Sequence, residues 1–482
     1  MTEKELRFPS RILLSEGDVR SAEQLLIPIE LQLPTGPYPA RPWAELRGKC
    51  ALLFDFGREM RGGVRILCHW LVGAKVDAAP ARLRFGESAA ECCAELGERG
   101  TTNHHAPRDF SILLSGMSSV RFGETGFRFA RLDLDLPEGA SLNLLAVVAE
   151  GEILSLPARY TYTGKDALLS DIYRTAKRTV DLCATGDYVW DGIKRDRLVW
   201  IGDMHPEMLA LTTLYGRVPS LENSIRFMKD TTPPEAWMCG IVTYSAWWLA
   251  TLADYTEITG AIDFAAPLLP YAQATVRHLL SIVSEAGDIE TDGRLFVDWP
   301  TKGKEDEADG VRAILLLAAK KAAALFASMA YPTKEAVALV ARLSKQPILV
   351  RSSMQVVGLK YMATGALEPS DVAILREKGA RGMSTFMSYY ILTAYARYLG
   401  KDAAIAVMKE YYGAMLSRGA TTFFEDFDLL WLAGSSRIDE LPAEGESDLH
   451  GDFGAYCYLG FRHSLCHGWS AGILRFMKDC DL

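Results

Sequence analysis

The sequence predicts a multidomain protein in which an N-terminal β-sandwich is followed by a larger all-α part. At 482 residues the chain is too long for one small core, so two or three domains are expected. Between residues 49 and 154, short apolar runs, several of them alternating, are separated by Gly, Pro and Asp turn signals, which is typical of a sandwich. After about residue 160 the apolar residues recur at three- and four-residue steps, as in half-buried helices.

The elements follow in chain order. Residues 1–48 are rich in proline and are expected to form an extended lead-in that packs on the sandwich. The sandwich domain, 49–158, contains predicted strands at 51–56, 63–70, 110–114 and 127–136. The helical domain, 159–482, contains predicted helices at 168–183, 205–215, 220–229, 241–258, 263–284, 310–330, 334–345, 368–378, 383–399, 402–415 and 464–478.

Composition limits the class of function. A net charge of −9 and a pI near 5.6 argue against a nucleic-acid partner, because no basic face is implied. Nine scattered cysteines lack the spacing of a zinc site or a disulfide framework, so neither a metal nor another cofactor is predicted. The first residues lack an apolar stretch of signal-peptide length, and no later run is long enough to span a bilayer. We expect a cytoplasmic protein without a membrane partner, and the composition leaves a homodimer open.

One stretch, residues 191–203, contains an unusual number of charged and aromatic residues that could form an active site. It holds three acids, Asp191, Asp196 and Asp203, together with two arginines, a lysine and a tryptophan. Carboxylates beside aromatic rings suit a site that holds a sugar, since rings stack on C–H faces and acids transfer protons. The alternative is a helix cap with a surface salt-bridge cluster, and composition alone does not separate the two.

Two further motifs lie near the other end of the chain, at residues 419–426 (Gly-Ala-Thr-Thr-Phe-Phe-Glu-Asp) and 466–472 (Cys-His-Gly-Trp-Ser-Ala-Gly). In this order and at this separation, the three motifs resemble those of the bacterial α-L-rhamnosidases of glycoside hydrolase family 78. Phrases upstream, at residues 55–59 and 84–88, look like the β-sandwich domain of that family. The resemblance covers nearly the whole chain.

The resemblance implies a fold. Its members carry the site in the funnel of an (α/α)6 barrel, so residues 159–482 are expected to form such a toroid. Related enzymes continue past the His-Gly-Trp-Ser segment into a small C-terminal β-domain. Here the sequence ends about ten residues after Gly472, so that domain is expected to be missing, either because this subgroup lacks it or because the sequence is cut before it.

The resemblance also implies roles for single residues. Asp196 matches the general acid, although most relatives have Glu there, and Glu425 matches the general base of an inverting hydrolase. The positions that match sugar-binding residues or offer flat walls for a 6-deoxysugar are Asp191, Arg195, Trp200, Asp203, Trp237, Tyr244, Trp299 and His467.

The function expected from these matches is release of terminal α-L-rhamnose from small glycosides by general acid and general base catalysis. Two alternatives stay open. The chain could be an (α/α)6 glycosidase or phosphorylase for another sugar, although Glu425 argues against a phosphate-binding group at the position of the base. It could also be a sugar-binding homologue whose catalysis is weakened, for which Asp196 in place of Glu is the hint.

Overall fold

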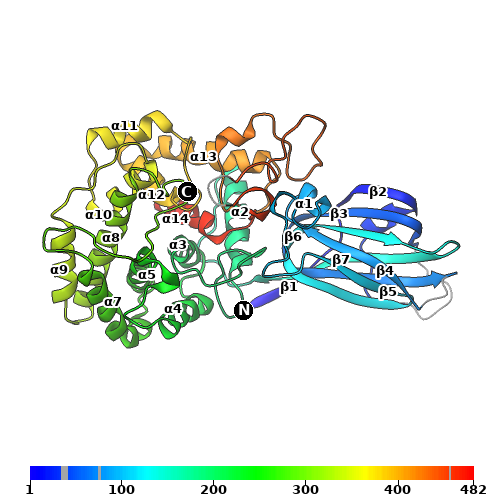
Figure 1. Ribbon diagram of the computed structural model, residues 1–482, viewed down its shortest axis with the longest axis horizontal. Coiled ribbons are helices and arrows are strands. Elements are labelled where there is room, and N and C mark those ends of the chain that lie inside the picture. The colour runs from blue at the N-terminus through cyan, green and yellow to red at the C-terminus, as the bar shows by residue number, and fades with distance from the viewer. Residues whose placement is uncertain (34–41, 74–76, 455–457) are drawn as a thin grey trace.

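The structure is a computed structural model that describes residues 1–33, 42–73, 77–454 and 458–482. It has two parts side by side, a β region built from residues up to Leu154 and a helical region that begins at Ala167 (Figure 1). The segment between them, residues 155–166, contains no regular element.

The β region is an antiparallel sheet. Across the described residues it has seven strands, with β1, β7, β3, β6, β4 and β5 adjacent in that order and β2 paired to β3. Their bounds are Thr2–Arg7 (β1), Arg11–Arg20 (β2), Ala44–Val72 (β3), Ala78–Gly86 (β4), Asp109–Ser115 (β5), Ser118–Asp135 (β6) and Ser141–Leu154 (β7). A short helix, α1 (Ala89–Cys93), follows β4.

The sheet curls strongly. Leu144 of β7 pairs both with Ala44 at the start of β3 and with Cys68 near its end, so the long β3 bends around the sheet. The inner face buries an apolar core that includes Phe54 and Phe127. The side chains of Phe56 and Phe127 pack edge to face, which adds to the burial of apolar area.

The N-terminal residues correct one expectation. Within 1–48, expected as a lead-in, β1 and β2 are strands of the sheet itself, and β3 already begins at Ala44. Most side chains of β1 and β2 are exposed or half-buried, so these strands show little of the in-and-out apolar alternation that identifies a strand in sequence. The proline-rich stretch 34–41, part of the expected lead-in, lies outside the described residues.

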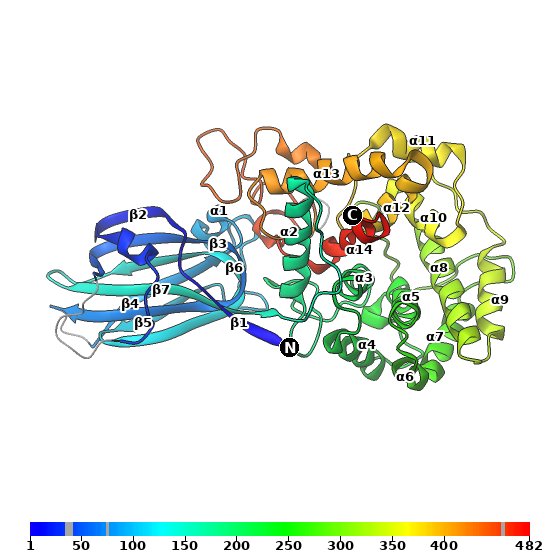
Figure 2. The ribbon, with the colours of Figure 1, turned by 180° about the vertical axis from the view of Figure 1, so that it is seen from behind.

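The helical region forms a continuous circuit of packed helices. Helix α3 packs on α5, α5 on α8, α8 on α10, α10 on α12, and α14 packs on both α12 and α3 (Figures 1 and 2). The bounds are Ala167–Cys183 (α2), Met204–Tyr215 (α3), Pro219–Thr231 (α4), Val242–Thr259 (α5), Ile262–Ala265 (α6), Leu269–Ser281 (α7), Glu307–Ser328 (α8), Lys334–Leu343 (α9), Met354–Thr364 (α10), Pro369–Lys378 (α11), Ser388–Leu399 (α12), Lys401–Ser417 (α13) and Ile473–Asp479 (α14). None of the helices in the described ranges is long and apolar enough to cross a membrane.

Several helices differ from the sequence prediction. The stretch predicted as one helix at 263–284 consists of α6, a 3₁₀ turn and α7, and the helix predicted at 383–399 begins only at Ser388. Helix α10 was not predicted because it is apolar nearly all round, with Gly358 packed against the backbone of Tyr390, and such a helix has no amphipathic period. The helix predicted at 464–478 begins only at Ile473. Residues 464–467 are not helical, with an isolated β-bridge between His467 and Gly192, and a 3₁₀ turn, Gly468–Gly472, joins them to α14.

Candidate active site

A pocket in the helical region is formed by loops that are distant in sequence. The loop before α3, the loop after α13 and the segment before α14 all reach it. Its lining residues are Asp191, Arg195, Asp196, Trp200, Asp203, Ile241, Tyr244, Arg294, Phe296, Trp299, Glu425, Tyr458, His467 and Trp469.

A wider and more open cleft beside α2 lacks this convergence of acids and rings. Its charged side chains pair with one another, as Lys177 does with Asp181 and Arg174 with Asp171. Such pairing is typical of a polar domain boundary.

Arg195 joins the two acids predicted to be catalytic. Its Nη1 donates to Asp196 Oδ2 at 2.8 Å, and its Nη2 donates to both carboxylate oxygens of Glu425. Arg195 and Glu425 are 230 positions apart in sequence, so the fold alone brings them together. The Arg195 guanidinium is fixed in turn by the Arg462 carbonyl at 2.7 Å and by the ring of Tyr458, 4.0 Å away. The acids therefore face a common cation rather than bulk water.

Glu425 is held at several points. Its Oε2 accepts from the Ser464 amide at 3.1 Å, and its main-chain carbonyl accepts from Trp469 Nε1 at 2.9 Å and from Thr385 Oγ1 at 2.7 Å. The side chain is buried. These bonds fix the direction of the carboxylate, which a general base needs.

Asp196 lies on an unusual turn. Asp196 and Arg197 have positive φ values of 53° and 56°. Asp is among the non-glycine residues that adopt this left-handed region most readily, which gives a physical reason for Asp rather than Glu at this position. His105 of the β region approaches from the other side, with Nδ1 3.5 Å from Asp196 Oδ1. The Asp196 side chain keeps 14 % of its surface exposed, so it lies at the rim of the site.

Asp191, Asp203 and His467 form the floor of the pocket. His467 Nε2 lies 3.9 Å from a carboxylate oxygen of each acid. Burial raises the pKa of Asp191 well above its usual range, with the charges of Asp203 and Asp196 adding to the effect. Burial likewise raises the pKa of Asp203, whose Oδ1 accepts from Tyr244 at 3.0 Å, and lowers the pKa of His467 to about 4. At neutral pH the His467 ring is therefore neutral.

Aromatic rings line two sides. Trp200 and Tyr244 meet edge to face at 6.0 Å, and Trp299 lies between Phe296 at 5.0 Å and Tyr458 at 6.0 Å. Within the described part of the chain, Trp200 Nε1 is buried with no hydrogen-bond partner. The pocket thus offers flat apolar faces and an unused donor.

The structure brings all but one of the predicted site residues together. Trp237 is not among the lining residues; its ring stacks on His278 at 3.8 Å instead. The lining residues that the sequence did not single out are Ile241, Arg294, Phe296, Tyr458 and Trp469. Trp469 lies inside the marked stretch 466–472, whereas Arg294 and Tyr458 carry no local signal.

Buried histidines near the site predict a stability that depends on pH. His463 Nε2 accepts from the Asp426 amide at 3.0 Å, and burial lowers the pKa of His463 to about 3 from a usual value of 6.5. Between these values the unfolded chain binds a proton that the folded chain does not, so the free energy of unfolding falls as the pH falls below 6.5.

Replacing His463 by Gln, whose amide oxygen can accept the same bond, should remove this contribution. Below pH 6.5 the wild type should lose about 1.4 kcal/mol more per pH unit than the variant in urea unfolding. Equal losses in the two proteins at pH 7 and pH 5 would show that His463 is protonated in the folded protein.

Comparison with solved structures gives the class of fold. A rhamnosidase from Klebsiella oxytoca with rhamnose bound aligns over 100 % of this chain and 96 % of its own, with a TM-score of 0.78 and 19 % identity. A GH78 family rhamnosidase of Bacillus sp. GL1 aligns over 95 % of this chain and 48 % of its own, with a TM-score of 0.70 and 19 % identity. A Streptomyces avermitilis α-L-rhamnosidase complexed with L-rhamnose aligns over 89 % of this chain and 42 % of its own, with a TM-score of 0.66 and 15 % identity.

No protein-family model matches the chain, and no curated protein matches its sequence. The alignments with solved structures show that the protein has the fold of the α-L-rhamnosidases. They confirm the resemblance that three short sequence motifs indicated.

Proposed function

We propose that this protein is an inverting exo-α-L-rhamnosidase that acts on small glycosides. The observation that carries the proposal is the convergence of Asp196 and Glu425 on one guanidinium, Arg195, in a pocket walled by acids and aromatic rings. Rhamnose is the sugar named for two neighbours of the same fold. Fold similarity at this identity does not fix a substrate, so the sugar is the part of the proposal that most needs a test.

The reaction needs two carboxyl groups. Asp196, as general acid, gives its proton to the glycosidic oxygen while the bond to the anomeric carbon breaks. Glu425, as general base, takes a proton from a water that attacks the anomeric carbon from the opposite face. Because one planar guanidinium contacts both groups, their nearest oxygens lie within about 8 Å of each other. This limit includes part of the roughly 6.5–9.5 Å range of inverting enzymes and also the roughly 5 Å of retaining enzymes, so the choice of inversion comes from the resemblance.

Arg195 bridges the two acids. It donates to Asp196 and to both carboxylate oxygens of Glu425. In the proposed reaction Glu425 must be ionised to accept the proton of the water, and Asp196 must carry a proton to act as the acid.

The remaining residues hold the sugar. Asp191, Asp203 and the neutral His467 offer hydrogen bonds to ring hydroxyls, and Trp200 Nε1 offers a further donor. Tyr244 fixes the orientation of Asp203, while Trp299 gives an apolar face for the C6 methyl group of a 6-deoxysugar.

The fold and setting are part of the same proposal. We assign a β-sandwich to the β region, including β1 and β2, and an (α/α)6 barrel to residues 159–482, which the circuit of packed helices supports. A cytoplasmic location and a homodimer remain predictions. Among the alternatives, a phosphorylase is disfavoured because a buried carboxylate at Glu425 would repel phosphate where the attacking group must sit.

A panel of p-nitrophenyl glycosides, assayed with and without phosphate, tests the proposal. We expect α-L-rhamnoside to be cleaved at least about a hundredfold faster than the other sugars, with no increase in rate from phosphate. Preference for a different sugar would overturn the substrate, and dependence on phosphate would overturn hydrolysis. Sugar binding without turnover of any glycoside would favour the non-catalytic alternative.

A further inference from the structure

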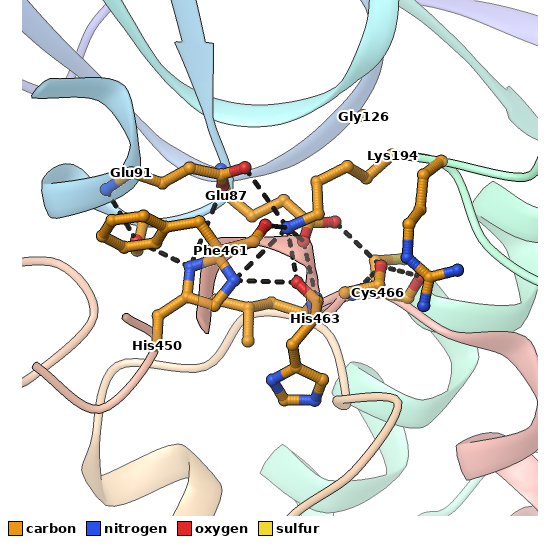
Figure 3. Close-up of polar contacts among 12 residues, drawn as sticks. Glu87, Glu91, Gly126, Lys194, His450, Phe461, His463 and Cys466 are labelled. Carbon is orange, nitrogen blue, oxygen red and sulfur yellow. Dashed lines mark hydrogen bonds and ion pairs between the residues drawn. The ribbon is translucent and has the colours of Figure 1, made fainter. Parts of the chain in front are cut away.

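A buried ammonium group lies where the two regions of the protein meet. Lys194, the neighbour of Arg195, is 2 % exposed. Its ammonium lies among the side chains of Glu87, Glu91 and His450 (Figure 3). Its Nζ contacts Glu87 Oε2 at 3.1 Å, Glu91 Oε1 at 3.2 Å, His450 Nε2 at 3.3 Å, the Phe461 carbonyl at 2.8 Å and the His463 carbonyl. Glu87 and Glu91 belong to the β region. The other partners, His450, Phe461 and His463, belong to the long connection between α13 and α14.

The cluster is not arranged to take a metal ion. Glu87, Glu91 and His450 each place one ligand atom within 4.8 Å of the others, which is a spacing a cation could use. The Lys194 ammonium already contacts all three and supplies the positive charge there. Arg108 adds a second cation at 2.9 Å from Glu91, so the buried acids are paired with protein groups.

Glu87 reaches the base through a short chain of bonds. Its Oε2 accepts from the Leu465 amide at 2.6 Å, and its Oε1 accepts from Ser464 Oγ at 3.2 Å. The amide of the same Ser464 donates to Glu425 Oε2 at 3.1 Å. One carboxylate of the β region therefore holds the segment that orients Glu425.

Glu87 also holds the loop that carries Asp196, the proposed general acid. Glu87 binds Lys194, which precedes Arg195 and Asp196 in the chain. The β region supports this loop at another point, where the Gly126 amide donates to the Ile193 carbonyl at 2.8 Å. A Cβ at Gly126 would lie 2.5 Å from Ile193 Cγ1, so glycine is required for this close approach.

We propose that Glu87 is a positioning residue of the β region that sets the relative placement of Asp196 and Glu425, through Lys194 on one side and Ser464–Leu465 on the other. The inference rests on the proposed function for its catalytic meaning, but the geometry stands without it. Glu87 is not among the residues that line the pocket, so we expect its substitution to change kcat more than KM.

Glu87→Gln tests the proposal, because glutamine keeps the size of the side chain and removes its charge. We expect kcat on an α-L-rhamnoside to fall about ten- to a hundredfold, as displacements of about 1 Å do, with KM changed less than about threefold. If Glu87 acts through Lys194, Glu87→Gln combined with Lys194→Met should cost less than the product of the two single losses.

Glu5→Gln is the matched control. Glu5 is another largely buried β-region carboxylate. It pairs across the boundary with Arg178 of α2 at 2.9 Å and, within the β region, with Arg58, but it contacts neither catalytic loop. Its kcat should equal that of the wild type. If Glu5→Gln and Glu87→Gln lose the same fraction of kcat, a general loosening of the boundary explains the loss and the proposal is overturned.

Two further measurements test the role of Glu87 if the Glu87→Gln variant does not fold or if the wild type cleaves no rhamnoside. Should Glu87→Gln fail to fold, Ser464→Ala removes the hydroxyl bond to Glu87, and an unchanged kcat in that variant would overturn the proposal. Should the wild type cleave no rhamnoside, the proposed function fails. A crystal structure of Glu87→Gln then decides the inference, which requires the bond from Ser464 to Glu425 to lengthen or break.

Discussion

Glu425→Gln should lose about a thousandfold or more of kcat on every rhamnoside, because an amide cannot take the proton of the attacking water. The variant should fold normally, since the bonds from Trp469 and Thr385 go to the main-chain carbonyl of residue 425 and survive the substitution. Steady-state kinetics with a p-nitrophenyl α-L-rhamnoside, together with circular dichroism, provide the measurement.

The neighbouring acid offers a control for this result. Asp426 is buried beside Glu425, and its Oδ1 accepts from the amide of Phe427. Asp426→Asn replaces a buried carboxyl group next to the base but leaves the carboxylate of residue 425 in place, so kcat should stay within about tenfold of the wild type. A Glu425→Gln variant as active as Asp426→Asn would mean that another group is the base.

Asp196→Asn should lower kcat most on substrates whose leaving group must be protonated to depart, and least on substrates whose leaving group departs as a stable anion. With an alkyl or sugar aglycone, which leaves poorly, we expect kcat to fall about a hundred- to a thousandfold. With a dinitrophenyl aglycone, which leaves without protonation, the loss should be less than about tenfold. The comparison of the two substrates in one variant is the measurement.

An equal loss on both substrates would place Asp196 in binding rather than in proton transfer. Arg195 lies between Asp196 and Glu425, so a structural effect of the substitution on Glu425 must be separated from a chemical one. A change in KM without a change in the dependence on the leaving group would indicate that structural effect.

Much of the site could be predicted because its acids lie in short recognisable stretches. Asp191, Asp196 and Asp203 share one loop, and Glu425 and His467 lie in two others, and the structure places all five around one pocket. The helical region was predictable for a similar reason, since an amphipathic period reports which face of a helix is buried.

Other features carry no local signal. Tyr458 and Arg294 enter the pocket from loops whose sequence is unremarkable, and only the fold shows that they line it. Trp237 fits the sequence pattern, but its ring stacks on His278 outside the pocket. The bond of Glu87 to Lys194 joins two regions of the chain, and no spacing rule in a single sequence reports such a long-range pair.

The stereochemistry of the first product tests the account most directly. In the proposed inverting mechanism the two carboxyl groups leave room for both sugar and water and no covalent glycosyl-enzyme forms, so an α-L-rhamnoside should release β-L-rhamnose first. Proton NMR of the anomeric signals during the first minutes of turnover should show the β signal rising before mutarotation produces the α form. An initial α product would contradict the pairing of Asp196 with Glu425 and would require a nucleophile roughly 5 Å from the acid.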